Sequence, residues 1–170
     1  MTLRKHTAQR RTPRGFALLE AAISSLLVGL VFVAALRCVG AAVEGRTDNA
    51  ERVRGMLLVQ HMLAELQTVA YQEPSWYLWW GPDWGESSSN RSTFDDFDDY
   101  DNYVESPPKN LLNQVPLNCS DWTRKIDVDW VNPADPSIQI GSEQGVKRAT
   151  VQAIHNGVVV AQASILKGNN

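Results

Sequence analysis

Histidine and cysteine are scarce in this sequence, and the few copies are scattered. The 170 residues include three histidines and two cysteines. The chain contains no CxxC pair, no zinc-ligand spacing and no glycine-rich phosphate loop. His6, His61 and His155 have no serine or cysteine nucleophile at a recognisable spacing. We therefore expect that this protein is not an enzyme and needs no cofactor, apart from the calcium ion considered below.

Basic residues are also sparse outside the first 14 positions. Five of the 16 Lys and Arg residues lie in residues 1–14, which contain no acid, so 11 basic residues face 19 acidic ones in the rest of the chain. An acidic body argues against a nucleic-acid partner, because phosphate binding needs a basic face. A basic cluster directly before an apolar run is instead typical of the cytoplasmic flank of a membrane span.

Charge is nearly absent from residues 16–36, where Glu20 is the one charged residue. A helix of this length spans roughly 30 Å, which is enough to cross the hydrocarbon core of a bilayer. The basic flank predicts a single pass with a cytoplasmic N-terminus and an exported C-terminal body. A secretion signal cleaved near Gly40-Ala41-Ala42 and an ordinary signal anchor are the alternatives.

Glu20 is the feature that an ordinary anchor does not explain. A carboxylate one turn into a membrane helix costs on the order of a few kcal/mol unless it is neutralised or paired. A cut between Gly15 and Phe16 would release an amine four residues before Glu20, and a neighbouring helix with an axial offset would bring a second such amine within reach. Alternatively, the carboxyl group extends to the interface or is protonated in lipid. The spacing alone does not separate these two explanations.

The segment Arg14–Glu20, RGFALLE, resembles the processing motif of type IV prepilins and type II secretion pseudopilins. The resemblance covers about the first 40 residues. It implies that a prepilin peptidase cuts after Gly15, that Phe16 is then N-methylated, and that Glu20 guides assembly. The implied partners are the peptidase and methyltransferase, other pilin or pseudopilin subunits, the inner-membrane assembly platform and membrane lipid. The implied location is the inner membrane and then a periplasmic or surface filament.

The rest of the chain is expected to form a helix and then a β-rich head. Apolar residues recur at helical steps, which predicts an amphipathic helix that ends by about residue 72. The expected apolar stripe is Met56, Val59, Leu63, Leu66 and Ala70. We divide the chain into a leader (1–15), a membrane and assembly helix (16–43), an amphipathic helix (44–72) and an extracytoplasmic head (73–170).

An aromatic segment opens the head. It contains Trp76, Tyr77, Trp79, Trp80 and Trp84. A stacking platform for sugar or nucleic acid is one interpretation. We favour the other, in which these rings cover the core between helix and sheet, because the surrounding charge is negative and buried Trp stabilises small domains strongly.

An acidic segment follows at residues 94–108. Its aspartates are Asp95, Asp96, Asp98, Asp99 and Asp101. Oxygen ligands at this density suit Ca²⁺, although the spacing does not match an EF-hand. The alternative is a solvated acidic surface loop held by its aromatic residues. This segment resembles one in proteins related to the MSHA minor pilin D, and residues 60–66 resemble I-type minor pseudopilins.

The last third of the chain is predicted to be β-structure. Apolar and polar residues alternate over residues 121–131, which the Pro-containing stretch 132–136 then interrupts. Residues 147–154 and 158–166 flank Asn156-Gly157, a strong two-residue hairpin signal. We expect three antiparallel strands, or four. The predicted fold class is α+β: a long N-terminal helix packed on a small antiparallel sheet, as in pilins.

These observations predict a structural subunit of a type IV pilus-like or type II secretion filament. The alternative function is a single-pass, membrane-anchored binding module whose acidic loop holds calcium or a partner. Pairing of Cys38 with Cys119 stays open, as does the cellular system that the subunit serves.

Overall fold

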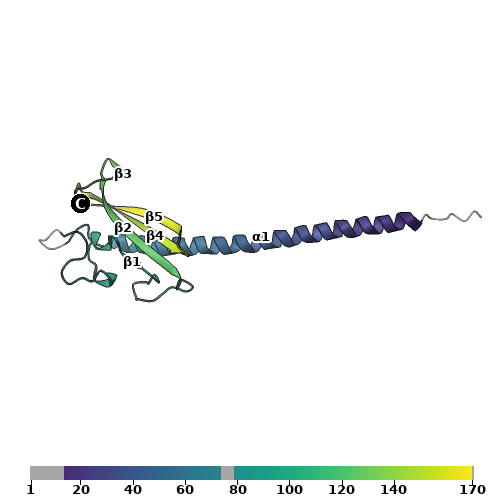
Figure 1. Ribbon diagram of the computed structural model, residues 1–170. Helices are drawn as coiled ribbons and strands as arrows, with labels where there is room; N and C mark the ends of the chain where they lie inside the picture. The colour runs from purple at the N-terminus through teal and green to yellow at the C-terminus, as the bar shows by residue number, and fades with distance from the viewer. Residues whose placement is uncertain (1–13, 74–78, 170) are drawn as a thin grey trace, which may run out of the picture. The chain divides into compact units, whose positions relative to one another are not determined.

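The structure is a computed structural model that describes residues 14–73 and 79–169, with side chains from residue 17 onward. A single long helix, α1 (Arg14–Thr68), is followed by an antiparallel five-stranded sheet (Figure 1). The predicted α+β class is therefore confirmed. The chain divides into two compact units, one up to Thr47 and one from Asp48 onward, and each is described by itself. The predicted leader lies almost entirely outside the described residues.

The second unit contains the C-terminal turns of α1 and every strand. The strands are β1 (Val104–Glu105), β2 (Trp122–Asn132), β3 (Asp135–Gln139), β4 (Val146–His155) and β5 (Val158–Gly168). Two single-turn 3₁₀ helices, η1 (Arg91–Thr93) and η2 (Asp98–Tyr100), lie in the segment between α1 and the sheet.

The sheet has the strand order β1-β2-β4-β5, and β3 pairs with β2 beside this path. The hairpin between β4 and β5 turns at Asn156 and Gly157, whose φ angles of 51° and 76° are those that a tight two-residue turn requires. Our strand count was too low. The stretch after Asn132 makes a short turn instead of ending the sheet, and β3 then pairs back onto β2.

The predicted apolar stripe of α1 is confirmed at Val59 and Leu66, which are buried, and at Leu63, which packs on the core, but the buried face as a whole is rotated relative to it. The residues that become buried are Gly55, Leu58, Val59, Met62 and Leu66. Met56 instead leaves 58% of its surface exposed. The helix also ends at Thr68, so that Ala70 lies beyond it and is exposed.

The lack of a side chain at Gly55 explains why this face of α1 packs on the sheet. A Cβ atom there would lie 3.2 Å from Ala161, Val160 and the ring of Trp122, so the missing side chain lets helix and sheet approach each other closely. Two sets of apolar residues at helical spacing overlap in this part of the sequence. Only the set that includes Gly55 leaves a position without a side chain, where the sheet can approach the helix.

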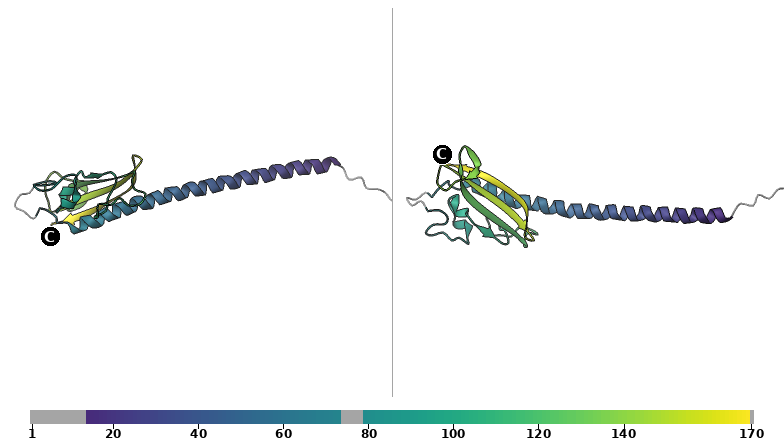
Figure 2. Two further views of the ribbon diagram at one scale, coloured as in Figure 1. Left: turned by 90° about the horizontal axis from the view of Figure 1, so that it is seen from below. Right: turned by 45° about the horizontal axis from the view of Figure 1, so that its top comes forward.

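The core lies between this face of α1 and the inner face of the sheet. Strand β2 contributes Trp122 and Ile126, and β4 contributes the small side chains of Ala149 and Ala153. The strands run side by side along the C-terminal turns of the helix (Figure 2). Alternation along β2 and β4 places most of the apolar residues inward, as the sequence predicted, although the polar residues Arg124 and Lys147 are also buried on that face.

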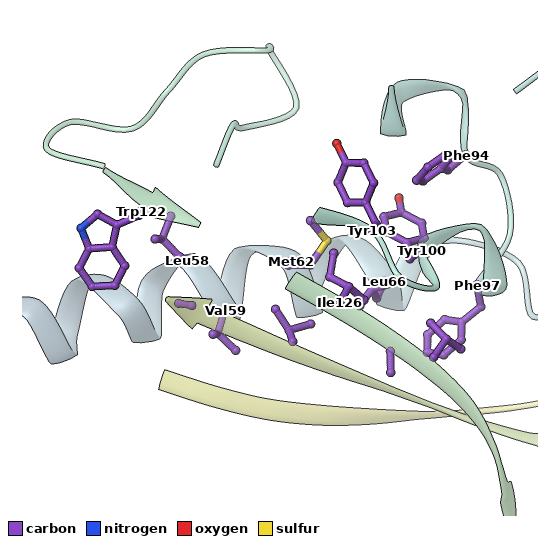
Figure 3. Close-up of a cluster of buried hydrophobic side chains, with 14 of the residues drawn as sticks. Leu58, Val59, Met62, Leu66, Phe94, Phe97, Tyr100, Tyr103, Trp122 and Ile126 are labelled. Atoms are coloured by element: carbon purple, nitrogen blue, oxygen red, sulfur yellow. The ribbon is translucent and has the colours of Figure 1, made fainter. Parts of the chain in front are cut away.

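Aromatic side chains of the acidic segment complete the same core. Phe94, Phe97, Tyr100 and Tyr103 are buried and gather near the helix residues Met62 and Leu66 (Figure 3). Phe94 makes edge-to-face contacts with Tyr100 and Tyr103, with ring centroids 5.1 and 5.4 Å apart.

The expected role of the aromatic segment was wrong. Trp79 is 71% exposed and Trp84 is fully exposed, while Trp80 is partly exposed. Trp76 and Tyr77 lie outside the described residues. The core instead takes its buried indole from Trp122 on β2, because a strand of the sheet faces α1 directly.

Candidate functional site

The N-terminal processing motif lies at the start of α1. The backbone of Gly15 and Phe16 is helical, but their side chains lie outside the described set. Phe16 and Glu20 are four residues apart and thus one turn apart on the same face of the helix. The Glu20 side chain is exposed, and within the part of the chain that the structure describes it has no ion pair or hydrogen bond.

The helix that carries Glu20 is long and apolar enough to cross a membrane. None of its most apolar window is buried, and every side chain from Ala17 to Glu44 is exposed. Exposed apolar surface on this scale is unusual in a soluble monomer and marks a surface that contacts lipid or other protein.

The two cysteines are both free. Cys38 is exposed on α1, whereas Cys119 is buried in the second unit. Burial raises the pKa of the Cys119 thiol, which makes it less reactive than an ordinary cysteine.

The acidic segment is not a solvated surface loop. Asp96, Asp98 and Asp99 are buried, whereas Asp101 is partly exposed and Asp95 is exposed. The aromatic residues between them point into the core and carry the aspartates inward. Each buried carboxyl group then needs a partner within the fold.

Asp98 has an ion pair as its partner. It accepts a hydrogen bond from the ammonium group of Lys147 on β4, and its other oxygen accepts from the Gly81 N–H at 3.2 Å. Lys147 also donates to the Tyr71 carbonyl at 2.7 Å. Both charged side chains are almost completely buried, so this pair fixes the acidic segment to the sheet.

Asp96 and Asp99 instead accept hydrogen bonds from the backbone of their own segment. Asp96 Oδ1 accepts from the N–H groups of Asp98 and Asp99, and Asp99 Oδ2 accepts from those of Asp95 and Asp96. The pKa of Asp96 is raised to about 8, first by burial and then by the nearby Asp98 and Asp99 carboxylates, while Lys147 lowers it.

Asp101 connects the segment to β2. Its Oδ1 accepts from the Val128 N–H at 2.9 Å, and its Oδ2 accepts from the Trp80 indole at 3.0 Å and from the Asn102 amide at 2.8 Å. Asp101 therefore serves a structural role and is not directed toward the other four aspartates.

The carboxyl groups that come together are Glu86, Asp95 and Asp99. One oxygen of each lies within 4.8 Å of the others, close enough to share a cation. The pKa of Glu86 is raised to about 7, first by burial and also by Asp99 and Asp95, while the Asp83 N–H lowers it. Glu86 was not singled out from the sequence, because it lies in the preceding loop. Of the five aspartates predicted as ligands, Asp95 and Asp99 belong to this group, whereas Asp96, Asp98 and Asp101 have the partners described above.

Three hard oxygen donors fit Ca²⁺ or Mg²⁺ in chemical type. Calcium takes six to eight oxygens, so water and backbone carbonyls would have to supply the remainder. Glu86, Asp95 and Asp99 would hold the ion. Its positive charge would neutralise these carboxyl groups, which otherwise keep some of their protons.

A second buried charge network joins α1 to the sheet. Arg91 donates to Glu65 on the helix at 2.8 Å and also to Glu105 on β1, and Glu105 accepts from Arg124 on β2. The Tyr100 hydroxyl also donates to Glu65, at 3.1 Å. None of these residues was singled out from the sequence, because their partners are distant along the chain.

His155 forms a polar contact at the other end of the sheet. Its ring stacks on Trp122, with centroids 4.6 Å apart, and its nitrogens face Asp121 at 2.9 Å and Glu51 at 3.5 Å. Asp121 is the main cause that raises the pKa of His155. No nucleophile accompanies this pair in the described residues, and the arrangement ties α1 to the sheet.

Comparison of the chain with protein-family models, with curated proteins and with solved structures finds no match.

Proposed function

We propose that this chain is a subunit of a type IV pilus-like or type II secretion filament, as a minor pilin or pseudopilin. The observation that carries the proposal is Glu20, a carboxylate one turn after Phe16 on a helix whose apolar side chains are exposed from Ala17 to Val43. The architecture supports it, since a long helix whose C-terminal part packs on an antiparallel sheet is the plan of a pilin.

In this proposal the precursor waits in the inner membrane with its basic N-terminus in the cytoplasm. Prepilin peptidase cuts after Gly15, and Phe16 is N-methylated. The assembly platform then moves the subunit from lipid into a filament, where residues 16–43 pack against the helices of other subunits. The head provides surface contacts.

Glu20 would select the axial register of the new subunit. In an apolar environment, its carboxylate is stable only when a positive charge lies at the same depth. The amine of Phe16 on a neighbouring subunit meets that need at one offset between the helices. Other offsets leave both charges unpaired and are disfavoured.

Processing can be tested by expressing the precursor with a prepilin peptidase and measuring the mass of its N-terminal peptide. We expect a chain that begins at methylated Phe16. Gly15→Leu should leave the precursor uncut, because a side chain next to the scissile bond blocks its approach to the active site. Gly29→Ala, at a position with nothing within 4 Å, is the matched control and should be processed. A mature chain that begins at Met1 or Val43 would contradict the proposal.

Assembly can be tested with Glu20→Gln, which keeps the size of the side chain and removes its charge. This variant should be cut normally but enter purified filaments at least about tenfold less, which corresponds to about 1.4 kcal/mol. Glu44→Gln, an exposed acid beyond the proposed membrane segment, is the control and should assemble normally. Equal incorporation of Glu20→Gln and the native chain would refute the pairing.

A second candidate function is a membrane-anchored binding module that holds calcium. The convergence of Glu86, Asp95 and Asp99 favours it. Millimolar Ca²⁺ should raise the melting temperature of the head, more at pH 8 than at pH 6 because protons compete with the ion. Asp95 is exposed, so Asp95→Asn should fold and lose the effect. No shift with Ca²⁺ at either pH would remove this candidate.

A further inference from the structure

A groove of about 390 Å³ lies between α1 and the connection from β1 to β2, and neither proposed function uses it. We call residues 109–119 of this connection the leucine loop. Its side chains Leu111 and Leu112 line the groove, and they are 75% and 76% exposed. Neighbouring apolar side chains that stay this open mark a surface that another molecule covers.

A second groove, of about 500 Å³, begins at His61, which also lines the first, and follows α1 toward Asn49. Val53 and Leu57 of the helix line it together with Leu117 of the leucine loop. These three side chains are 60%, 49% and 87% exposed. The two grooves therefore form one path along this side of the helix, and its far part is apolar.

The first groove has a charge that the fold does not neutralise. Arg91 and Arg124 on its lining are paired with Glu65 and Glu105, so these four charges cancel. Lys109 also lines the groove, and its ammonium group makes no ion pair with any residue that the structure describes. This part of the path is therefore positive and attracts an anion.

A buried donor on the same lining favours the same ligand charge. Arg124 is 2% exposed, yet its Nε has no hydrogen-bond acceptor. Its other nitrogens donate to the carbonyl groups of Leu58 and Lys109 and to Glu105. A buried donor without an acceptor is costly, so a negative group in this groove would stabilise the guanidinium.

The second groove has no acid on its described lining that would repel an anion. Arg54 lines it and makes no ion pair among the described residues, although Asp121 acts on it from a longer distance. An anionic molecule can therefore extend from the first groove into the second.

We propose that this path binds a single-chain carboxylate such as a fatty acid. The carboxylate lies near Lys109 and Arg124, and the alkyl chain follows α1 past Leu57. From His61 to Val53 the helix rises about 12 Å, which suits a chain of roughly ten carbons. A neutral alcohol of the same length would leave Lys109 without a counter-ion, and one apolar path accommodates one chain.

The test uses the full chain in nanodiscs of phosphatidylcholine, a lipid without net charge. The probes are decanoate and decanol that carry the same photoreactive diazirine at mid-chain, and mass spectrometry of the digested chain locates the label. We expect decanoate to label residues 49–68 and 109–119 saturably, and decanol to label them about tenfold less because it lacks the charge. Equal labelling by both probes, or labelling confined to residues 16–43, would overturn the proposal.

Charge variants locate the carboxylate. Lys109→Gln should fold, because the backbone of Lys109, and not its ammonium group, contacts Arg91 and Glu105. It should raise the half-saturating concentration of decanoate about tenfold, and Lys109→Arg should restore it. Lys125→Gln, which removes an exposed ammonium group on β2, is the control and should bind normally. An unchanged half-saturating concentration in Lys109→Gln would refute the assignment.

Chain length and Leu117 test the apolar part of the path. Unlabelled hexanoate, octanoate and decanoate should displace the probe with affinities that rise by up to about fourfold per CH₂ group. Leu117→Ser changes an exposed side chain, so it should fold and reduce this rise. Leu166→Ser, at an exposed leucine of β5, is the matched control. Equal affinities of the three carboxylates for the native chain would contradict the alkyl site.

Two other occupants are tested by competition. Nanodiscs that contain phosphatidylglycerol offer an anionic phospholipid, and trileucine offers a C-terminal carboxylate on an apolar peptide. Weaker competition by both than by decanoate supports the single-chain carboxylate. Stronger competition by either assigns the path to a phospholipid or to the end of a polypeptide, and would overturn the fatty-acid assignment.

Discussion

The two halves of helix α1 both contain many apolar residues, but they differ in charge and lie in opposite environments. From Ala17 to Glu44 every side chain is exposed, whereas Leu58, Met62 and Leu66 are buried in the core of the second unit. Leu and Val are common in both halves, so apolar content does not decide burial. The second half is covered because a sheet with a complementary face folds onto it. The first half has a surface that needs lipid or another helix as its partner.

The largest expected effect comes from removing the ammonium group of Lys147, which holds the acidic segment over the second half of α1. Lys147→Met should lower the free energy of unfolding by about 3–5 kcal/mol, because it leaves Asp98 buried without its counter-ion. Lys125→Met, at the exposed pair with Asp127, should cost at most about 1 kcal/mol. Urea unfolding of the full chain in detergent, followed by Trp fluorescence, measures both. Similar losses in the two variants would show that the buried pair contributes little.

The comparison of the two halves of α1 can be tested by replacing one leucine with alanine in each half. Leu66→Ala should lower the free energy of unfolding of the head by about 2–5 kcal/mol, because it leaves a cavity beside Met62 and Ile126. Leu30→Ala, on the exposed half, should change it by less than about 0.5 kcal/mol. The same urea titration compares them. A large loss from Leu30→Ala would mean that the first half also stabilises the head.

Acidic groups should make the head less stable as the pH rises. Asp96 has a raised pKa of about 8 in the folded state, so the folded state binds a proton that the unfolded state loses near pH 4. That stabilisation is fully present below pH 4 and disappears as the pH rises to about 8. Glu86, with its pKa raised to about 7, acts in the same direction.

Melting temperatures between pH 5 and pH 9 measure this effect. Asp96→Asn should be more stable than the native chain at pH 9 and should reduce the slope. Asp135→Asn is the control, because that carboxyl is exposed on β3 and the Ser137 hydroxyl lowers its pKa. A slope unchanged by Asp96→Asn would show that another group titrates.

The smallest expected effect on stability comes from replacing two glycines of α1 by alanine, one in each environment. Gly45→Ala, with nothing within 4 Å, should stabilise the helix by up to about 1 kcal/mol and so raise the melting temperature slightly. Gly55→Ala gains the same helix propensity but presses a methyl group on Trp122 and Ala161, so it should be neutral or destabilising. Circular dichroism during thermal unfolding compares them. A larger gain at Gly55 would mean that helix and sheet separate easily.

Local patterns in the sequence predicted the parts of the fold that depend on neighbours along the chain. Alternation located β2 and β4, and Asn156-Gly157 located the hairpin. The processing motif is equally local, although the residues before Ala17 have no described side chains. These features follow from periods of two or 3.6 residues and from turn conformations, which need no long-range information.

The sequence did not predict features whose partners are distant. Asp98 lies 49 residues before Lys147, so its burial was not visible in a run of aspartates. Glu86 joins Asp95 and Asp99 only through the loop conformation. The orientation of α1 depended on the absence of a side chain at Gly55, which a hydrophobic stripe does not record. Each error arose where tertiary contacts decide between two locally equal choices.

The place of β4 and β5 after α1 and the acidic segment dictates when the head can mature during synthesis. A nascent chain that has emerged only up to Gly145 carries the apolar side of α1 and the carboxylate of Asp98, yet lacks the strand and the ammonium group that cover and neutralise them. The chain must therefore be synthesised through β5, which ends at Gly168, before the domain closes. Until then, the exposed helix and aspartates are the parts that a chaperone would protect or a protease would cut.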